Sequence, residues 1–249
     1  MGKDSMKREE LRESLGAYLD LIDEAEAVIA STTYQPKEHD LSTIIDVLAP
    51  PPLDLDSIEG ANLRVLQAMV ESCTKCRLYE GRTMTVFGEG SVPARVMVIG
   101  EGPGAEEDRS GRPFVGRAGE YLDTWLKSIH LERGKGVYIA NIVKCRPPNN
   151  RDPQNDERVA CMPYLKRQIQ LVKPQLILLL GRTAAQVLLE TDEGVGALRG
   201  RYHRYEGIPT VVTYHPAAVL RNTDTLRRPV WEDLIRVAAF LGIDLGRRS

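Results

Sequence analysis

Four short apolar runs, each separated from the next by a helix-like stretch, constrain the fold of this chain more than any other feature. The apolar runs span residues 95–99, 137–142, 175–180 and 210–214. Helical patterns span about 116–129, 156–172, 183–190 and 230–241. Strands and helices that alternate in this way predict a parallel sheet covered by helices on both faces. We therefore expect an α/β fold: a three-layer α/β/α sandwich with a central four-stranded parallel sheet.

The first 60 of the 249 residues differ from the rest in charge and in pattern. They hold 5 of the 33 Lys and Arg residues but 14 of the 35 Asp and Glu residues, so residues 61–249 carry a net charge of +7 although the whole chain carries −2. Apolar residues recur at helical spacing up to about residue 30, and a proline-rich stretch follows. We expect an acidic N-terminal extension, a helix plus a linker, over 1–60 and a basic domain over 61–249.

The charge and hydropathy of the two parts suggest their surroundings. The basic domain is suited to contacts with phosphate. The amphipathic, acidic extension could bind a protein partner or shield the basic face, and the sequence leaves open whether it does either. No apolar run approaches membrane-spanning length, and the charged start of the chain lacks the apolar segment of a signal peptide. We therefore expect a soluble, cytoplasmic protein without a membrane partner.

Residues of catalytic type follow the four predicted strands. The first strand leads into Glu101 and Gly102, the second ends in Asn141, the third is followed by Arg182, and the fourth by His215. In open parallel sheets, ligands bind beyond the carboxyl ends of the strands. We expect a carboxylate, an amide, an arginine and an imidazole to meet at this edge, which is the predicted active site.

The segment GEGPGA, at 100–105, also fits a loose dinucleotide-binding pattern. That function requires a helix that opens at this turn and an acidic residue about 20 positions later. A polar stretch follows instead, and the second strand ends in Asn141, so a dinucleotide site is the less favoured hypothesis. Phe114 lies in a loop between Gly111 and Gly116, where it is suited either to stack on a base or to plug the core.

The chain has only four cysteines: Cys73, Cys76, Cys145 and Cys161. In an intracellular protein this number favours a metal site over disulfide bonds. Zinc ribbons usually contain two C-x2-C pairs, whereas one close pair with two single cysteines is more common for an iron–sulfur cluster. The spacing leaves the metal open, with unrelated buried cysteines as the other alternative.

Several motifs in a fixed order make the sequence resemble the family 4 uracil-DNA glycosylases, the iron–sulfur type of bacteria and archaea. The resemblance extends from about residue 63 to residue 241. Its motifs are CTKCRLYEGRT, VIGEGPGAEEDRSGRPFVGRAGEYLD, NIVKCRPPNNRDP, CMPYL, LLLGRTAA and YHPAAVL. It implies an enzyme that excises uracil from DNA by hydrolysing the N-glycosidic bond of a flipped nucleotide, and so initiates base-excision repair.

The resemblance also implies roles for individual residues. The four cysteines match the ligands of a structural [4Fe-4S] cluster. The expected catalytic residues are Glu101, Glu107 and His215. The expected uracil-binding residues are Glu101, Gly102, Phe114, Asn141 and His215. Among these, Phe114 stacks on the base, Asn141 reads its edge, and His215 lies near its O2. Which of the two carboxylates positions the attacking water stays open.

Base flipping needs a group that enters the vacated space. In HPAAVLR, Val219 or Leu220 is the expected apolar wedge, and Arg221 is expected to contact phosphate or the vacated stack. Gly102 replaces the family's usual alanine, which predicts a looser turn and a wider base pocket. An inserted basic loop found in a related DNA-trapping group is missing from this sequence, so turnover is expected.

Two further hypotheses remain. One differs only in substrate: a glycosylase of broader range that also acts on other deaminated bases, which Gly102 keeps open. The other is a non-enzymatic iron–sulfur protein that binds nucleic acid as a redox sensor. We expect a monomer, because a glycosylase must search DNA and flip single bases.

Overall fold

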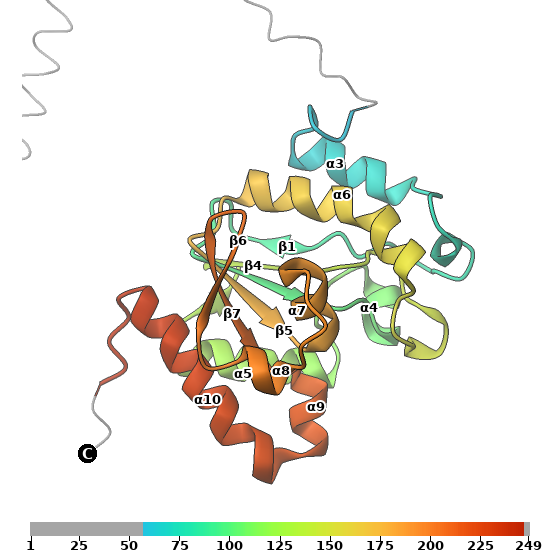
Figure 1. Ribbon diagram of the computed structural model, residues 1–249. Coiled ribbons are helices and arrows are strands. Elements are labelled where there is room, and N and C mark those ends of the chain that lie inside the picture. Colours follow the sequence, from blue (N-terminus) through green and yellow to red (C-terminus); the bar gives the residue numbers. More distant parts are fainter. Residues whose placement is uncertain (1–56, 247–249) are drawn as a thin grey trace, which may run out of the picture. The chain divides into compact units, whose positions relative to one another are not determined.

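The computed structural model describes residues 57–246, which form a mixed sheet with helices on both faces (Figure 1). The predicted extension over 1–60 lies outside the described residues except for 57–60, so its helix, its linker and its boundary stay predictions. Within the described range, no helix combines the length and the apolar character that crossing a membrane would require.

The four central strands are parallel and coincide with the four apolar runs. They are β2 (Val96–Gly100), β4 (Gly136–Asn141), β5 (Leu176–Leu180) and β7 (Ile208–Thr213), in the spatial order β4-β2-β5-β7. The register pairs Gly100 with Asn141 and Leu180 with Thr213, so the strands end at one common edge. The predicted parallel core of the sheet is confirmed.

Short edge strands that the sequence did not predict extend this sheet to seven strands within the described range. β1 (Glu89–Gly90) and β3 (Glu132–Arg133) pair with β4, and β6 (Tyr202–Tyr205) pairs with β7. β1 and β6 run antiparallel to their neighbours, so the sheet is mixed. Strands of two residues have no measurable periodicity, and Tyr205 is the one buried residue of β6, so neither kind of edge strand gives the signal of a buried strand.

Three of the four predicted helices are confirmed to within one residue at each end, whereas the fourth begins seven residues earlier than predicted. In chain order, the helical segments are α3 (Leu63–Glu71), η1 (Arg77–Tyr79), α4 (Ala105–Ser110), α5 (Arg117–Ser128), η2 (Pro148–Asn150), α6 (Asn155–Val172), α7 (Arg182–Leu189), α8 (Val195–Leu198), α9 (Pro216–Arg221) and α10 (Thr223–Phe240). The largest difference is α10, which begins before Pro229 rather than after it. The carbonyl left without its usual donor belongs to Thr225, in an exposed turn where water can bind it.

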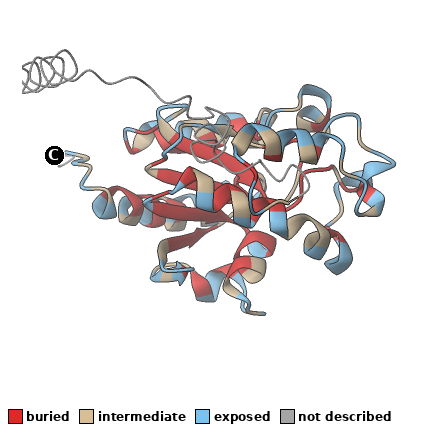
Figure 2. Ribbon diagram, turned by 90° about the horizontal axis from the view of Figure 1, so that it is seen from above, coloured by how far each residue is buried: buried red, intermediate tan, exposed pale blue. Residues whose placement is uncertain are grey.

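Alternate residues of each central strand pack on opposite faces of the sheet. Met97 and Ile99 of β2 pack in the cluster that includes α6 and α7, whereas Val96 and Val98 pack in the cluster that includes α5 and α10. Because both faces are covered, the strands consist almost entirely of buried apolar residues (Figure 2). This three-layer arrangement leaves the ends of the strands as the place where polar side chains meet.

The segment that precedes the sheet adds a smaller core of its own. Leu66 and Val70 of α3 pack with Phe87 and with Tyr164 of α6. Figure 1 shows α3 lying along α6. This contact brings the C-x2-C pair, which directly follows α3, near the single cysteine of α6.

Candidate active site and cysteine cluster

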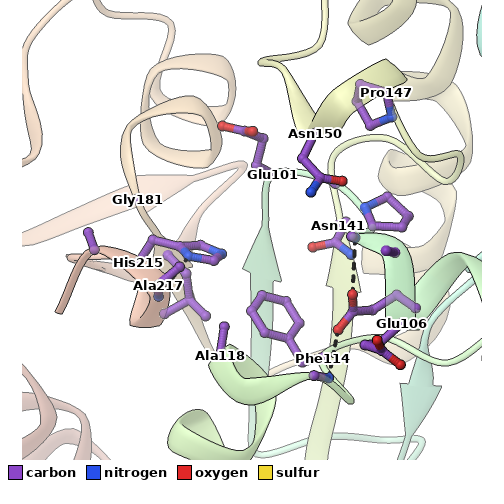
Figure 3. A pocket seen from close by; sticks show the side chains of 18 of the residues that line it. Glu101, Glu106, Phe114, Ala118, Asn141, Pro147, Asn150, Gly181, His215 and Ala217 are labelled. Atoms are coloured by element: carbon purple, nitrogen blue, oxygen red, sulfur yellow. Dashed lines mark hydrogen bonds between the residues drawn. The ribbon is translucent and has the colours of Figure 1, made fainter. Parts of the chain in front are cut away.

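A cavity of about 520 Å³ lies at the carboxyl edge of the central strands (Figure 3). The ends of the strands contribute Glu101, Asn141 and His215, which approach from three different elements. The loop before α5 contributes Phe114, η2 contributes Asn150, and Glu107 of α4 also lines the cavity. The structure therefore brings together the residues that the strand-end argument selected. The chemical role of each one is a separate question.

Phe114 and Asn141 form the floor of the cavity against Gly100. A Cβ atom at Gly100 would lie 2.5 Å from Phe114 Cζ and 2.6 Å from Asn141 Oδ1, so only glycine fits there. Asn141 is 1% exposed, and its Oδ1 accepts no hydrogen bond from the described residues. Because an unpaired buried amide oxygen is costly, this atom is suited to accept an N–H from a ligand.

The aromatic ring of Phe114 stands beside the imidazole of His215. Their ring centroids are 5.6 Å apart, and the planes are tilted by 35°. Phe114 has a left-handed backbone (φ 51°), and its carbonyl accepts a hydrogen bond from Arg133 Nη2 at 2.6 Å. The loop is thus held in an unusual conformation that places the ring in the cavity, where a flat base can stack on it.

Glu107 holds two loops together through its carboxylate. Its Oε1 accepts from the backbone N–H groups of Val115 and Gly116 at 2.9 and 3.0 Å, and its Oε2 accepts from that of Gly104 at 3.1 Å. Both oxygens are therefore engaged by the backbone. This geometry suits the organisation of the loop that carries Phe114 better than the activation of water.

His215 is the N-cap of α9, and its ring is fixed by the backbone. Nδ1 accepts from the N–H of Ala217 at 3.2 Å, so in the neutral ring the proton is on Nε2. Burial, together with the charge of Arg221, lowers the pKa of His215 to about 4. The side chain is consequently a neutral imidazole near pH 7, with one N–H free to donate.

Glu101 points away from Phe114 and Asn141, toward α7 (Figure 3). Its Oε2 accepts a hydrogen bond from Thr183 Oγ1 at 2.5 Å. Burial raises the pKa of Glu101, while the Thr183 hydroxyl and the nearby guanidinium groups of Arg182 and Arg158 lower it. Unlike Glu107, Glu101 keeps one oxygen that no described group occupies.

The space around Gly102 does not support the predicted widening of the base pocket. A Cβ atom at Gly102 would lie 2.8 Å from Val143 Cγ2, so Val143 already fills the position that an alanine methyl would occupy. Val143 is 1% exposed and β-branched, which limits its freedom to move. Glycine at this position therefore compensates for Val143 and opens no extra room on that side.

The segment predicted to hold the wedge forms a short helix, α9. The burial of its residues distinguishes the two apolar candidates, Val219 and Leu220. Val219 is 0% exposed and packs in the core shared by α5 and α10, so its assignment as a wedge is wrong. Leu220 is 38% exposed, and Arg221 lines the cavity. Of the two, only Leu220 is available to enter DNA.

All four cysteines line a second, small cavity beside α3 and α6: Cys73, Cys76, Cys145 and Cys161. No three His, Cys, Asp or Glu side chains within 57–246 are grouped as the ligands of a single metal ion. Hydrogen-bond donors face the sulfurs. Arg82 Nη1 lies 3.2 Å from Cys145 Sγ, and the backbone N–H of Lys144 lies 3.3 Å from Cys161 Sγ. Such donors suit thiolate ligands.

Sequence patterns missed several polar residues at both sites. Lys144 is 1% exposed, and its Nζ donates to the carbonyl of Asn141 at 2.9 Å, which joins the strand end to the cysteine-bearing loop. Arg82 and Thr183 bind partners 63 and 82 positions away. Only the tertiary fold brings such partners together, so no local signal in the sequence identifies these residues.

Comparisons with known proteins agree with this arrangement. The family model described as the uracil DNA glycosylase superfamily matches residues 87–235. The type-4 uracil-DNA glycosylase of Sulfurisphaera tokodaii is 44% identical over 74% of this chain and 84% of its own length. Those of Pyrobaculum aerophilum and Thermotoga maritima are 43% and 41% identical, over 75% and 72% of this chain and 96% and 94% of their own lengths. The chain therefore belongs to the uracil-DNA glycosylase superfamily, in its type-4 branch.

Proposed function

We propose that the protein excises uracil from DNA by hydrolysing the bond between the base and its deoxyribose. The observation that carries this proposal is the unpartnered Oδ1 of Asn141, buried at the floor of the cavity beside Phe114. The proposal also rests on the similarity to type-4 uracil-DNA glycosylases over most of the chain. A base held in a duplex cannot reach such a cavity, so the nucleotide must be flipped out.

Recognition of uracil follows from the donor and acceptor pattern of the Asn141 amide. Uracil presents an N–H at N3, which suits Oδ1, and a carbonyl at C4, which suits the amide NH2. Cytosine presents the opposite pattern at both positions and would leave buried polar groups unpaired. Phe114 supplies the surface on which the base stacks. Leu220 and Arg221 are proposed to occupy the space that the base leaves and to bind the adjacent phosphate.

Cleavage of the bond leaves negative charge on uracil and positive charge on the sugar. We assign the Nε2–H of the neutral His215 to donate to the uracil oxygen as that charge develops; the Nδ1 hydrogen bond and the lowered pKa support this role. Glu101 is the carboxylate with a free oxygen, so we assign it to orienting water or stabilising the sugar cation. Glu107 is assigned to positioning, because the backbone binds both of its oxygens.

We propose that Cys73, Cys76, Cys145 and Cys161 hold a [4Fe-4S] cluster. The residues fit such a group: four thiols line one cavity, and N–H donors face two of the sulfurs. When bound, the cluster supplies a structural link among α3, α6 and the loop that follows β4. That loop leads into Pro147 and Asn150 of the active-site cavity, so ordering it also shapes the cavity.

Replacing Cys73 with alanine is expected to abolish binding of the cluster. A protein purified without oxygen should lose its iron, its acid-labile sulfide and its visible absorbance, because the remaining three thiolates leave one iron without its ligand. The matched control is Ser72→Ala, one residue earlier, where the hydroxyl binds only carbonyls of its own helix. A Cys73→Ala protein with the full iron content of the control would contradict the assignment.

Replacing Glu107 with glutamine is expected to lower the single-turnover rate of uracil release about tenfold, the equivalent of one hydrogen bond. Glutamine can still accept on one side, but its NH2 group cannot accept from the N–H of Gly104. The control is Glu106→Gln, because Glu106 also lines the cavity but pairs only with Arg109. Equal rates in the two variants would argue against a positioning role for Glu107.

The proposed function is tested with oligonucleotides that carry one uracil opposite guanine, opposite adenine or in a single strand. Matched strands carry thymine, cytosine or hypoxanthine. Release of each base leaves an abasic site, which is detected by cleaving the strand there with alkali. The expected result is cleavage of the strands that carry uracil and of no others. Release of hypoxanthine as well would favour the broader-range enzyme, and intact strands with a full complement of iron would favour the redox-sensing binder.

Three further expectations accompany this function. The protein acts as a monomer on DNA, residues 1–60 bind a protein partner, shield the basic domain or do neither, and the enzyme works in the cytoplasm. Arginines at the rim of the cavity support the contact with DNA: Arg117, Arg151, Arg182 and Arg221.

A further inference from the structure

Thr183 is a buried residue of α7 that no sequence pattern singled out. It is 5% exposed, and it lies in the first turn of the helix that follows β5. Its hydroxyl donates to Glu101 Oε2 at 2.5 Å, across 82 positions of sequence. Thr183 is not among the residues that line the active-site cavity, whereas Glu101 is. The hydrogen bond to Glu101 is therefore the contact that connects Thr183 to the cavity.

The hydrogen bond fixes which way the carboxylate faces. One oxygen of Glu101 is held by the hydroxyl of α7, and the other has no partner among the described groups. The side chain lines the cavity and points away from Phe114 and Asn141 (Figure 3). The β-branched side chain of Thr183 has few rotamers, and its burial restricts them further. The direction of the carboxylate is thus set by a rigid donor on a helix.

We propose that Thr183 is a positioning residue for the release of uracil, holding the Glu101 carboxylate by one oxygen so that the other is presented to the sugar and the attacking water. This inference rests on the proposed function. It deepens that function by separating the two carboxylates: Glu101 is aimed by a side chain of α7, and Glu107 is bound by backbone N–H groups of the loops on either side of α4.

The charged groups around Glu101 predict how its ionisation responds. Burial is the largest influence and raises its pKa, and the carboxylate of Asp152 raises it further. The hydrogen bond from the Thr183 hydroxyl lowers the pKa of Glu101 most strongly, followed by the guanidinium groups of Arg182 and Arg158. Removing the hydroxyl therefore raises the pKa of Glu101. If the ionised carboxylate is the active form, the fall in rate on the acid side then begins at a higher pH.

The test compares Thr183→Val with Thr183→Ser in the cluster-loaded, full-length protein. Valine keeps the shape and removes the donor, whereas serine keeps the donor. The readout is the single-turnover rate of uracil release from a duplex with uracil opposite guanine, from about pH 5 to pH 9. Valine should lower the rate about tenfold to a hundredfold near pH 7. It should also move the acid side of the profile to higher pH, and serine should stay near wild type.

Other outcomes would overturn the inference. Thr183→Val with the wild-type rate and profile would do so, as would equal losses in the valine and serine variants, which would indicate a packing defect. Iron content and the melting temperature of each variant monitor folding. A wild-type protein that releases no uracil would refute the proposed function itself, and this outcome is distinct from both of the others.

Replacing Asp152 gives a second test, in which the pH profile should shift in the opposite direction. Asp152 Oδ2 forms an ion pair with Arg182 Nη2 at 2.6 Å, and its negative charge raises the pKa of Glu101. Asp152→Asn removes that charge and leaves Arg182 without its partner, and both changes favour the ionised carboxylate. The acid side of the profile should therefore move to lower pH. A profile that stays in place or moves to higher pH would show that it does not report Glu101, and would overturn the inference.

Discussion

Replacing His215 with alanine is expected to lower the single-turnover rate of uracil release about 10²–10³-fold, the effect of removing one donor to a developing anion. The Nε2–H is the side-chain donor at the end of β7, because Nδ1 accepts from the N–H of Ala217. Alanine would also remove the ring that stands beside Phe114. The loss should fall mainly on the chemical step, since the Asn141 amide and the Phe114 ring still bind the base.

The wild-type pH profile provides a second check on His215. Its pKa is lowered to about 4, so the imidazole stays neutral throughout the neutral range and should produce no step in the rate near the usual histidine value. The matched control for the alanine substitution is His203→Ala, because His203 lies in β6, does not line the cavity and, among the described residues, contacts only the carbonyl of Leu198 in α8 through its ring. A His215→Ala enzyme with the rate of this control would end the assignment of His215.

The sequence predicted the middle of the sheet well because burial leaves a strong pattern there. β2 and β5 are covered on both faces, so each is a continuous apolar run that few other structures explain. The edges had no such signal. β6 is joined to β7 by Glu206 and Gly207, both with left-handed backbones (φ 46° and 83°), the conformation of a tight hairpin. A four-residue strand with a single buried residue, before an unusual Glu-Gly turn, is not distinguishable from a loop by composition alone.

The residues of the candidate site also fall into two groups, those that the sequence could identify and those that it could not. Glu101, Asn141 and His215 could be chosen from sequence because the ends of parallel strands meet at one edge by geometry. Thr183 could not, because its partner is fixed only by how α7 packs. Val219 was misassigned because a helix was not expected directly after His215. In α9, one face of the helix packs against the core and the opposite face is exposed to solvent, and Val219 lies on the buried face.

Replacing Gly119 with alanine is expected to lower the rate of uracil release about 10²-fold, although Gly119 does not line the cavity. A Cβ atom at this position of α5 would lie 1.8 Å from the carbonyl oxygen of Phe114 and 2.0 Å from its carbonyl carbon. These are backbone atoms, so no side-chain rotation relieves the clash. Arg133 also holds the same carbonyl. Either α5 or the Phe114 loop must shift.

The shift should appear both as lost stability and as a displaced stacking surface. Overpacking of this kind costs about 1–3 kcal/mol, which a thermal melt with intact cluster would detect. The matched control is Gly196→Ala in α8, where the nearest atom to the new methyl is Tyr214 Oη at an ordinary 3.6 Å. Because the displaced ring is the surface on which the base stacks, Gly119→Ala should lose affinity for uracil-containing DNA together with rate. If it retained the rate and affinity of Gly196→Ala, the position of the Phe114 loop would not limit the reaction, and base stacking would have to be assigned to another residue.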